Sequence, residues 1–426
     1  MQIHVVTSGE TLFSIARRYA LAPGLLARYN GLTEPYRLAV GQSLLVLRPQ
    51  SIHTVRPGDT LFSIASRSGQ SVRALLRLNP NLTQQSALYP GQTVVTALED
   101  APEEPAAAFG YAYPNVQPAV LAAILPYASG LAPFTYGFSA DGSLVPLRDE
   151  DLLAQAKAAG TGAVMHLSTL TEDGTFSSTR AAALLEDERA QTVLIGNIVQ
   201  TMAERGYTAL DVDFEYLGAP LAAPYAAFLG RLRAAVHKNG HPLLAALAPK
   251  TSRDQPGLLY EGHDYAAVAQ NTDAVLLMTY EWGYSYSPPM AVAPLPSVRR
   301  VVEFALTEMP PEQIFLGFPN YGYDWTLPGT GERPRARSLG NEAAVRLAVE
   351  QGAEIRYDET AQTPWFSYTD ADGQPHEVWF EDVRSSQAKF SLLPQYHLRG
   401  LGYWNFMRPF TANFSLLNAK FRLPEP

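Results

Sequence analysis

Apolar and polar positions follow two alternating patterns in the larger, C-terminal part of the chain. From residue 107 onward, short apolar, β-prone runs alternate with stretches in which apolar side chains recur every three to four residues. The short runs predict eight strands, at 109–113, 133–138, 163–168, 209–216, 243–248, 274–280, 314–319 and 400–406. The clearest predicted helices lie at 152–159, 190–205, 225–239 and 298–308. Eight strands with helices between them indicate an α/β fold, a (β/α)8 or TIM barrel.

The barrel domain is predicted at 107–426. A small α+β insertion, at about 335–385, is expected between strands seven and eight. An open, doubly wound sheet is the alternative architecture for this pattern. It would carry a glycine-rich phosphate loop after the first strand, and the sequence has none there.

The first hundred residues repeat themselves. Residues 4–16 recur as 53–65, and each copy reads as strand, helix, helix, strand. Thr11 and Thr60 are the predicted N-caps of the first helix in each copy. The predicted boundaries are 1–48 for module 1, 51–98 for module 2 and 99–106 for a linker rich in Pro, Ala and acidic residues.

Composition narrows the classes of function. The hydrophobic fraction of 46% can fill a large core, and the net charge of -9 argues against nucleic acid as a partner. There is no cysteine, which excludes disulfides, thiolate metal sites and a cysteine nucleophile. The eight histidines show no metal-ligand spacing, so we expect no metal and no cofactor, and we expect structural roles for His166 and His263.

The N-terminal residues lack the basic and apolar regions of a signal peptide. No stretch reaches the roughly 18 uninterrupted apolar residues of a membrane span, so no membrane partner is expected. We expect a monomeric protein that is made soluble in the compartment that synthesises it.

Three carboxylates occupy alternate positions of the fourth predicted strand. Asp211, Asp213 and Glu215 share one face of that strand. The opposite face is expected to carry the apolar residues Leu210, Val212, Phe214 and Tyr216. An acidic face is costly unless a site uses it. A solvated edge strand is the alternative, but the apolar face favours an inner barrel strand, and Asp211 and Asp213 are expected to titrate as a coupled pair.

Barrel enzymes place their chemistry at the carboxyl ends of the strands. Acids and aromatic residues crowd these ends here: Met278 and Glu281 at strand six, Tyr321, Asp324 and Trp325 at strand seven, and Trp404 at strand eight. They are candidate substrate-binding residues for a sugar cleft. Ordinary packing is the alternative for the three at strand seven.

The two modules resemble LysM domains through their Gly-Asp/Glu-Thr-Leu-Phe-Ser-Ile-Ala runs and their Gly-Gln closing turns. The resemblance implies binding to N-acetylglucosamine polymers in a groove between two loops. The implied glycan-binding residues are Gly9, Thr11, Leu12, Phe13, Asn30 and Leu32 in module 1, and Gly58, Thr60, Leu61, Phe62, Asn79 and Leu82 in module 2. A pair of interaction or structural modules is the alternative. Two weak sites in tandem suit a polymeric ligand.

The barrel resembles family-18 glycoside hydrolases over roughly residues 107–423. The resemblance rests on the Asp-x-Asp-x-Glu strand, on Met-x-Tyr at strand six and on the tryptophan that ends strand eight. Two positions depart from the family pattern. Thr208-Ala209 replaces an Asp-Gly pair, and Glu281 stands where Asp is usual.

The resemblance implies a substrate-assisted, retaining glycosidase. Glu215 would protonate the leaving oxygen, and the substrate's own acetamido oxygen would attack the anomeric carbon. Asp213 would hold the acetamido N–H with Asp211 beside it, and Tyr280 would fix the acetamido oxygen. Trp404 would be the floor under the sugar.

Tandem LysM modules and the run from Met278 to Tyr284 resemble the spore-germination branch of the family, which degrades cortex peptidoglycan. That resemblance implies an N-acetylglucosaminidase at the spore coat and cortex boundary, made in the mother cell. A chitinase or general wall hydrolase, and a non-catalytic wall-binding coat lectin, are the alternatives. Inactive relatives usually lose the glutamate that is present here as Glu215.

Overall fold

The computed structural model of the chain describes residues 1–100, 102, 104–171, 175–327 and 335–425. Of the predicted linker 99–106, residues 101 and 103 therefore lie outside the described residues, as do 172–174, 328–334 and 426 of the predicted barrel domain.

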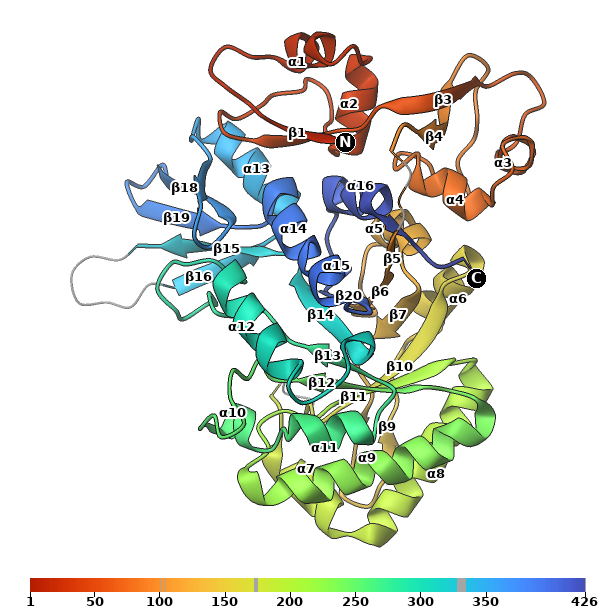
Figure 1. Ribbon diagram of the computed structural model, residues 1–426, viewed down its shortest axis with the longest axis vertical. Coiled ribbons are helices and arrows are strands. Elements are labelled where there is room, and N and C mark those ends of the chain that lie inside the picture. Colours follow the sequence, from red (N-terminus) through yellow and green to blue (C-terminus); the bar gives the residue numbers. More distant parts are fainter. Residues whose placement is uncertain (101, 103, 172–174, 328–334, 426) are drawn as a thin grey trace.

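Eight parallel strands close into a barrel, which confirms the predicted TIM fold (Figure 1). Around the barrel they are β6 (Ala107–Ala112), β7 (Gly130–Pro133), β10 (Gly162–Ser168), β11 (Ala209–Asp213), β12 (Leu243–Leu247), β13 (Ala274–Leu277), β14 (Ile314–Pro319) and β20 (Gly400–Trp404). Seven of them overlap the predicted strands throughout their length or nearly so. The second is β7, which lies earlier than the predicted 133–138. Beyond it, Tyr136 still forms an isolated parallel bridge with Leu167 of β10, and β8 (Gly137–Phe138) then forms a hairpin with β9 (Leu144–Val145).

Helices surround the barrel on its outside (Figure 1). They include α5 (Pro118–Ile124), α6 (Glu150–Ala159), α7 (Ser178–Glu186), α8 (Glu188–Arg205), α9 (Ala222–Val236), α11 (Tyr265–Gln270), α12 (Leu295–Ala305), α14 (Val383–Phe390), α15 (Leu392–Tyr396) and α16 (Thr411–Lys420). The four helices predicted most clearly are all present, with ends displaced by a few residues. Their apolar stripes and the outward-facing strand residues form one large buried core.

The insertion after β14 is a five-stranded antiparallel sheet with one helix. Its elements are β15 (Gly322–Thr326), β16 (Arg335–Leu339), α13 (Asn341–Glu350), β17 (Arg356–Asp358), β18 (Thr363–Thr369) and β19 (Pro375–Trp379). The sheet thus begins at β15, earlier than the predicted start near 335. The segment after Pro319 is a new strand of the insertion, not an extension of the seventh barrel strand.

Both modules have the predicted strand–helix–helix–strand order. Module 1 contains β1 (Gln2–Val5), α1 (Leu12–Arg18), α2 (Pro23–Tyr29) and β2 (Ser43–Val46), and module 2 contains β3 (Pro49–Thr54), α3 (Leu61–Arg67), α4 (Val72–Arg77) and β4 (Thr93–Leu98). The predicted caps are confirmed, because the Thr11 and Thr60 side chains accept hydrogen bonds from the backbone N–H groups of Ser14 and Ser63.

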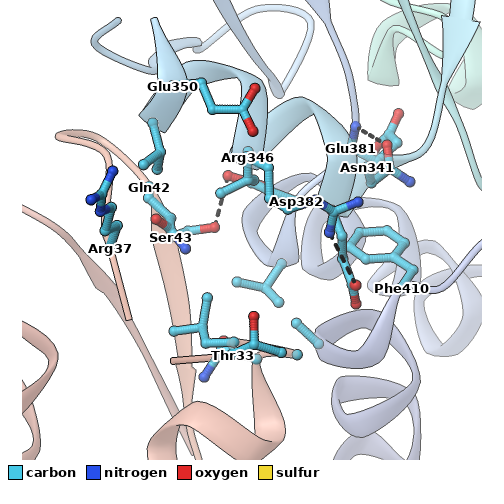
Figure 2. A pocket seen from close by; sticks show the side chains of 18 of the residues that line it. Thr33, Arg37, Gln42, Ser43, Asn341, Arg346, Glu350, Glu381, Asp382 and Phe410 are labelled. Atoms are coloured by element: carbon cyan, nitrogen blue, oxygen red, sulfur yellow. Dashed lines mark hydrogen bonds and ion pairs between the residues drawn. The ribbon is translucent and has the colours of Figure 1, made fainter. Parts of the chain in front are cut away.

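Module 1 lies on the insertion and on the loop before α14 (Figure 1). The N–H of Ile355 donates to the carbonyl of Val40 at 2.9 Å, and the Ser43 hydroxyl donates to Asp382 at 2.8 Å. Gly41 approaches so closely that an added Cβ would lie 1.7 Å from the carbonyl oxygen of Ile355. A cavity of about 490 Å³ remains at this junction, and Figure 2 shows Arg37 and Gln42 of the module lining it together with Asp382.

Module 2 contacts the barrel domain through two buried arginines of α4, Arg73 and Arg77. Arg73 on α4 donates to the backbone carbonyls of Pro126 (2.9 Å), Gly160 (2.5 Å) and Ala128. These acceptors lie just before the amino ends of β7 and β10. Each module therefore contacts the barrel domain directly, at a different place.

Candidate active site

Strand β11 carries two of the predicted catalytic acids into the barrel. Asp211 and Asp213 are buried, in register with His166 and Ser168 on the neighbouring β10. Glu215 follows two residues after the strand ends and is partly buried. Tyr216 departs from the prediction: its φ is 57° and 40% of its surface is exposed, so it does not pack on the apolar face. The strand ends too early to carry it there.

A hydrogen-bonded network lies beneath the acids. The Tyr111 hydroxyl donates to Asp211 Oδ2 at 2.8 Å, and His166 Nδ1 lies 2.9 Å from the same oxygen. His166 Nε2 lies 4.0 Å from Asp213 Oδ2. Within the described part of the chain, Asp211 Oδ1, Asp213 Oδ1 and His166 Nε2 are buried without a hydrogen-bond partner. Unsatisfied buried groups of this kind are rare in folded proteins and mark groups kept for a ligand.

The expected structural role fits His166, which is fully buried and contacts Asp211 through its Nδ1. Alternate residues of β10 point into the barrel, so the sequence could have placed His166 beside Asp211, but only with the strand order known. For His263 the expectation is confirmed, since its Nδ1 accepts from the Ala248 N–H at 2.9 Å and its Nε2 lies 2.9 Å from the Phe214 carbonyl. Burial lowers the pKa of His263 to about 4, so it is neutral.

The pKa values of Glu215 and Asp213 are raised. Burial, with the charge of Glu281, raises the pKa of Glu215 to about 7. Burial, followed by the charges of Glu215 and Asp211, raises the pKa of Asp213 well above its usual range, and His166 partly opposes this. A carboxyl group with a pKa near neutrality can both donate and accept a proton at working pH.

Tyr280 lies just beyond the end of β13, in the field of the same carboxylates. Burial, with the charges of Asp213 and Glu215, raises the pKa of its hydroxyl well above the usual value, so the group remains a hydrogen-bond donor. Its ring lies against Gly317, where an added Cβ would come within 2.9 Å of Tyr280 Cε1. Only glycine at 317 permits this approach.

A cavity of about 590 Å³ opens beside these residues. Its lining residues are Tyr113, Asn115, Gln117, Glu281, Tyr321, Tyr323, Ser338, Trp404, Asn405, Met407 and Arg408. The predicted residues Glu281, Tyr321 and Trp404 are therefore brought together here. Trp404 lies among aromatic rings, with centroid distances of 4.8 Å to Phe134 and 5.5 Å to Tyr111.

Glu281 is held by two tyrosines. Both the Tyr321 and Tyr323 hydroxyls donate to its carboxylate, the latter at 3.1 Å. Its backbone has a φ of 67°, which turns the residue out of the strand direction at the cavity mouth. Tyr323 and Arg408 were not among the predicted site residues, since only the insertion sheet and the loop after β20 bring them to the cavity.

Two predicted cleft residues lie elsewhere. Asp324 is buried in the insertion sheet, where it accepts from Arg337 (3.1 Å) and Tyr368 (3.0 Å). Trp325 is fully buried, and its indole N–H donates to the Ser287 carbonyl at 2.8 Å. The prediction is wrong for both, because β15 belongs to the insertion. Met278 is partly buried, with its N–H bonded to the Leu247 carbonyl, and does not line the cavity.

The predicted glycan-binding residues of the modules divide into two groups. Only Phe13 and Phe62 are large exposed apolar side chains, at 61% and 74%. Leu12, Asn30, Leu61, Asn79 and Leu82 are buried, so a glycan contact of these residues stays a prediction. Gly9 and Gly58 have positive φ values and shape the first loop, the two threonines cap helices, and Leu32 is partly buried.

Over the described residues, no cluster of three or more His, Asp or Glu side chains is arranged to hold a metal ion. Nor does any helix of that part of the chain have the length and apolar character needed to cross a membrane.

The closed (β/α)8 barrel carries Glu215 just beyond the carboxyl end of its fourth strand, and together with the family match this makes the chain a glycosidase. The chain belongs to the glycosyl hydrolases family 18, whose family model matches residues 169–408. The LysM domain model matches residues 4–46 and 53–96. Both predicted resemblances are confirmed.

Similar proteins extend over the whole chain. A cortical fragment-lytic enzyme of Bacillus subtilis (strain 168) is 38% identical over 430 residues, which cover 99% of each chain. The protein of the same name in Bacillus anthracis is 36% identical, with the same coverage. The crystal structure of the Bacillus cereus spore cortex-lytic enzyme SleL aligns with a TM-score of 0.83 and 34% identity, over 99% of this chain and 98% of that one.

Proposed function

We propose that this protein is an N-acetylglucosaminidase that hydrolyses β-1,4 bonds after N-acetylglucosamine in spore cortex peptidoglycan or its fragments. The observation that carries the proposal is Glu215, a partly buried acid with a pKa near 7 above the unsatisfied oxygen of Asp213. The names of the full-length relatives support the substrate.

In the proposed reaction, Glu215 gives its proton to the glycosidic oxygen as the bond from that oxygen to the anomeric carbon breaks. The acetamido oxygen of the same sugar attacks the anomeric carbon and forms an oxazolinium ion. Asp213 accepts the acetamido N–H and offsets its growing positive charge, supported by Asp211. The Tyr280 hydroxyl donates to the acetamido oxygen and fixes its direction of attack.

The second step returns the enzyme to its starting state. Glu215, now a carboxylate, takes a proton from a water molecule that attacks the anomeric carbon from the side the leaving group vacated. The oxazolinium ring opens and the acetamido group is restored. Two inversions give retention of configuration. A pKa near 7 suits a group that acts as acid and then as base.

The modules are proposed to hold glycan strands of peptidoglycan, with Phe13 and Phe62 as the stacking surfaces. In this proposal the protein acts as a monomer at the boundary of spore coat and cortex. Met278, beside Tyr280, is proposed to shape the base of the sugar site.

The test is product analysis with purified cortex fragments. Wild type and Glu215→Gln are incubated with the fragments and the new reducing ends are identified by mass spectrometry. We expect N-acetylglucosamine reducing ends from wild type, and a rate about 10²- to 10⁴-fold lower from the variant. Chitin oligomers are digested in parallel. Cleavage of chitin alone would overturn the cortex assignment in favour of a chitinase.

A further inference from the structure

Arg408 is the only cationic side chain among the described residues that line the catalytic cavity. It lies four residues after Trp404, which ends β20 and is the proposed floor of the sugar site. Glu281 is the one acidic residue among the described residues of this lining, and its carboxylate already accepts hydrogen bonds from Tyr321 and Tyr323. An anionic group on a substrate would therefore find its cationic partner in this cavity at Arg408.

The position of Arg408 is built by its neighbours. Its Nη1 donates to the Ser338 hydroxyl at 2.7 Å, and its aliphatic stem lies against Gly340, where an added Cβ would be 3.2 Å from Arg408 Cδ. Asn320 donates to the carbonyls of Asn405 and Arg408, at 2.9 and 2.8 Å, and so fixes the loop.

The guanidinium retains free donor capacity. Its hydrogen bonds within the described chain are those to the hydroxyl and carbonyl of Ser338, and none of the described carboxylates forms an ion pair with it. A guanidinium has five N–H donors in a planar fork, and that fork matches a carboxylate in a bidentate pair. A partly buried arginine without a carboxylate partner, facing a cavity, is suited to an anionic ligand.

The two candidate polymers differ in this respect. Chitin is an uncharged polymer of N-acetylglucosamine. Peptidoglycan alternates that sugar with muramic acid, which carries a lactyl ether ending in a carboxylate where no peptide is attached.

We propose that Arg408 is a specificity-determining residue, which pairs with the lactyl carboxylate of the muramic acid next to the N-acetylglucosamine held over Trp404. The proposal rests on the proposed function and deepens it. Arg408 takes no part in proton transfer. Its contribution is to binding, in the ground state and the transition state alike, so it acts mainly on KM.

The test compares charged and neutralised forms of one substrate. Peptide-free glycan fragments with free lactyl carboxylates are used directly, or after conversion of those carboxylates to methyl amides. Wild type, Arg408→Gln and Arg408→Lys are measured on both. Arg399→Gln is the matched control, because Arg399 precedes the same strand at the opposite end of the barrel and donates to the Glu312 carbonyl.

Arg408→Gln is expected to lower kcat/KM on the charged fragments about 10- to 100-fold, mainly through KM, since a charge-assisted hydrogen bond contributes roughly that factor. On the neutralised fragments it should match wild type. Arg408→Lys should retain part of the preference and lose it at high salt. Arg399→Gln should behave as wild type on both substrates.

An equal loss on both substrates would make Arg408 a loop-shaping residue and overturn the proposal, as would no loss on either. If wild type cleaves neither substrate, the proposed function fails by itself. The affinities of Glu215→Gln and of Glu215→Gln with Arg408→Gln for the charged fragments then decide the Arg408 proposal, and equal affinities would contradict it.

Discussion

One loop carboxylate in each module and the acids of the active site are placed in opposite environments. In module 1, the backbone N–H of Thr7 and the side chain of His4 lower the pKa of Glu10 to about 2. Asp59 of module 2 has the same arrangement with Arg56 and His53, and its pKa is lowered too. In the barrel, burial and like charges raise the pKa values of Asp213 and Glu215. Glu10 and Asp59 stabilise loops of the modules, whereas the acids of the active site are available to a substrate.

Buried amides extend this comparison. Asn79 is fully buried, and its side chain donates to the carbonyls of Leu75 and Val95 and accepts from the N–H of Val95, at 2.8 to 2.9 Å. Asn30 makes the same three contacts in module 1. Asp211 and Asp213 each leave one oxygen without a partner among the described residues. Stability and reactivity should therefore respond differently to substitution in the two regions.

The largest effect is expected for Asp213→Asn, which should lower kcat about 10²- to 10³-fold because a neutral amide cannot offset the charge of the oxazolinium ion. Stability should respond in the other direction. An acid with a raised pKa stabilises the fold fully only below its unfolded value, and that stability is lost as pH rises through the folded pKa. The amide of the Asp213→Asn variant does not ionise, so the variant should not show this loss.

The measurement is kcat on cortex fragments together with Tm at pH 5 and pH 8. At pH 8 the Tm of Asp213→Asn should be at least that of wild type. A clear fall in Tm would show that Asp213 holds the fold, as the module acids do, and would break the comparison.

Asn79→Ala should have the reverse profile. Removing its side-chain hydrogen bonds leaves buried backbone groups unsatisfied, at a cost of about 1–3 kcal/mol in the free energy of unfolding of module 2. Hydrogen exchange of module 2 amides should be faster, while kcat on short soluble fragments stays unchanged. Asn239→Ala, at an exposed position, is the control and should alter neither quantity. A lower kcat for Asn79→Ala would contradict the separation of roles.

A smaller effect is expected for Glu281→Gln, through pH dependence. The charge of Glu281 helps to raise the pKa of Glu215, so removing that charge lowers the pKa. Activity should fall as pH rises through about 7 in wild type, where Glu215 loses its proton, and at lower pH in the variant. The pH profile of kcat tests this, with Glu303→Gln on α12 as a distant control. If the alkaline limb of the profile has the same position in Glu281→Gln as in wild type, Glu281 does not raise the pKa of Glu215.

The smallest effect is expected at the module surfaces. Phe13→Ala and Phe62→Ala should each weaken binding to insoluble cortex by a few-fold, since one ring contributes about 0.5–1.5 kcal/mol. The double variant should lose more, because the two sites act on one polymer. Co-sedimentation with cortex measures this, with the exposed Val193→Ala on α8 as control. Turnover of short fragments should not change, and a loss there would contradict the assignment.

Local patterns in the sequence predicted most of the fold. Period-2 and period-3.6 runs located seven barrel strands well, because each run is long and bounded by polar segments. The second strand was displaced because β7 contains Gly130 and Pro133, residues that weaken a strand signal. The early start of the insertion was missed because a strand follows β14 almost without a break.

The limits of local sequence patterns also explain which residues of the site could be predicted. Asp211, Asp213 and Glu215 share one segment, so their spacing alone placed them together. His166, Tyr323 and Arg408 come from other elements, and only the closed barrel and the insertion sheet bring them near. The buried hydrogen bonds of Asn30 and Asn79 could not be predicted, because a family pattern does not distinguish a residue that shapes a loop from one that touches a sugar.

The contacts of Gly41 and Arg73 with the barrel domain have a kinetic consequence. An enzyme that is joined to its binding modules by flexible linkers can reach many glycosidic bonds around the point where the modules bind. Here each module contacts the barrel domain directly. The fold would therefore fix the distance between the point where a module binds the glycan strand and the bond that reaches the cleft. Cleavage would then occur at regular intervals along the polymer. Each further cleavage would require the modules to release the strand and bind it again.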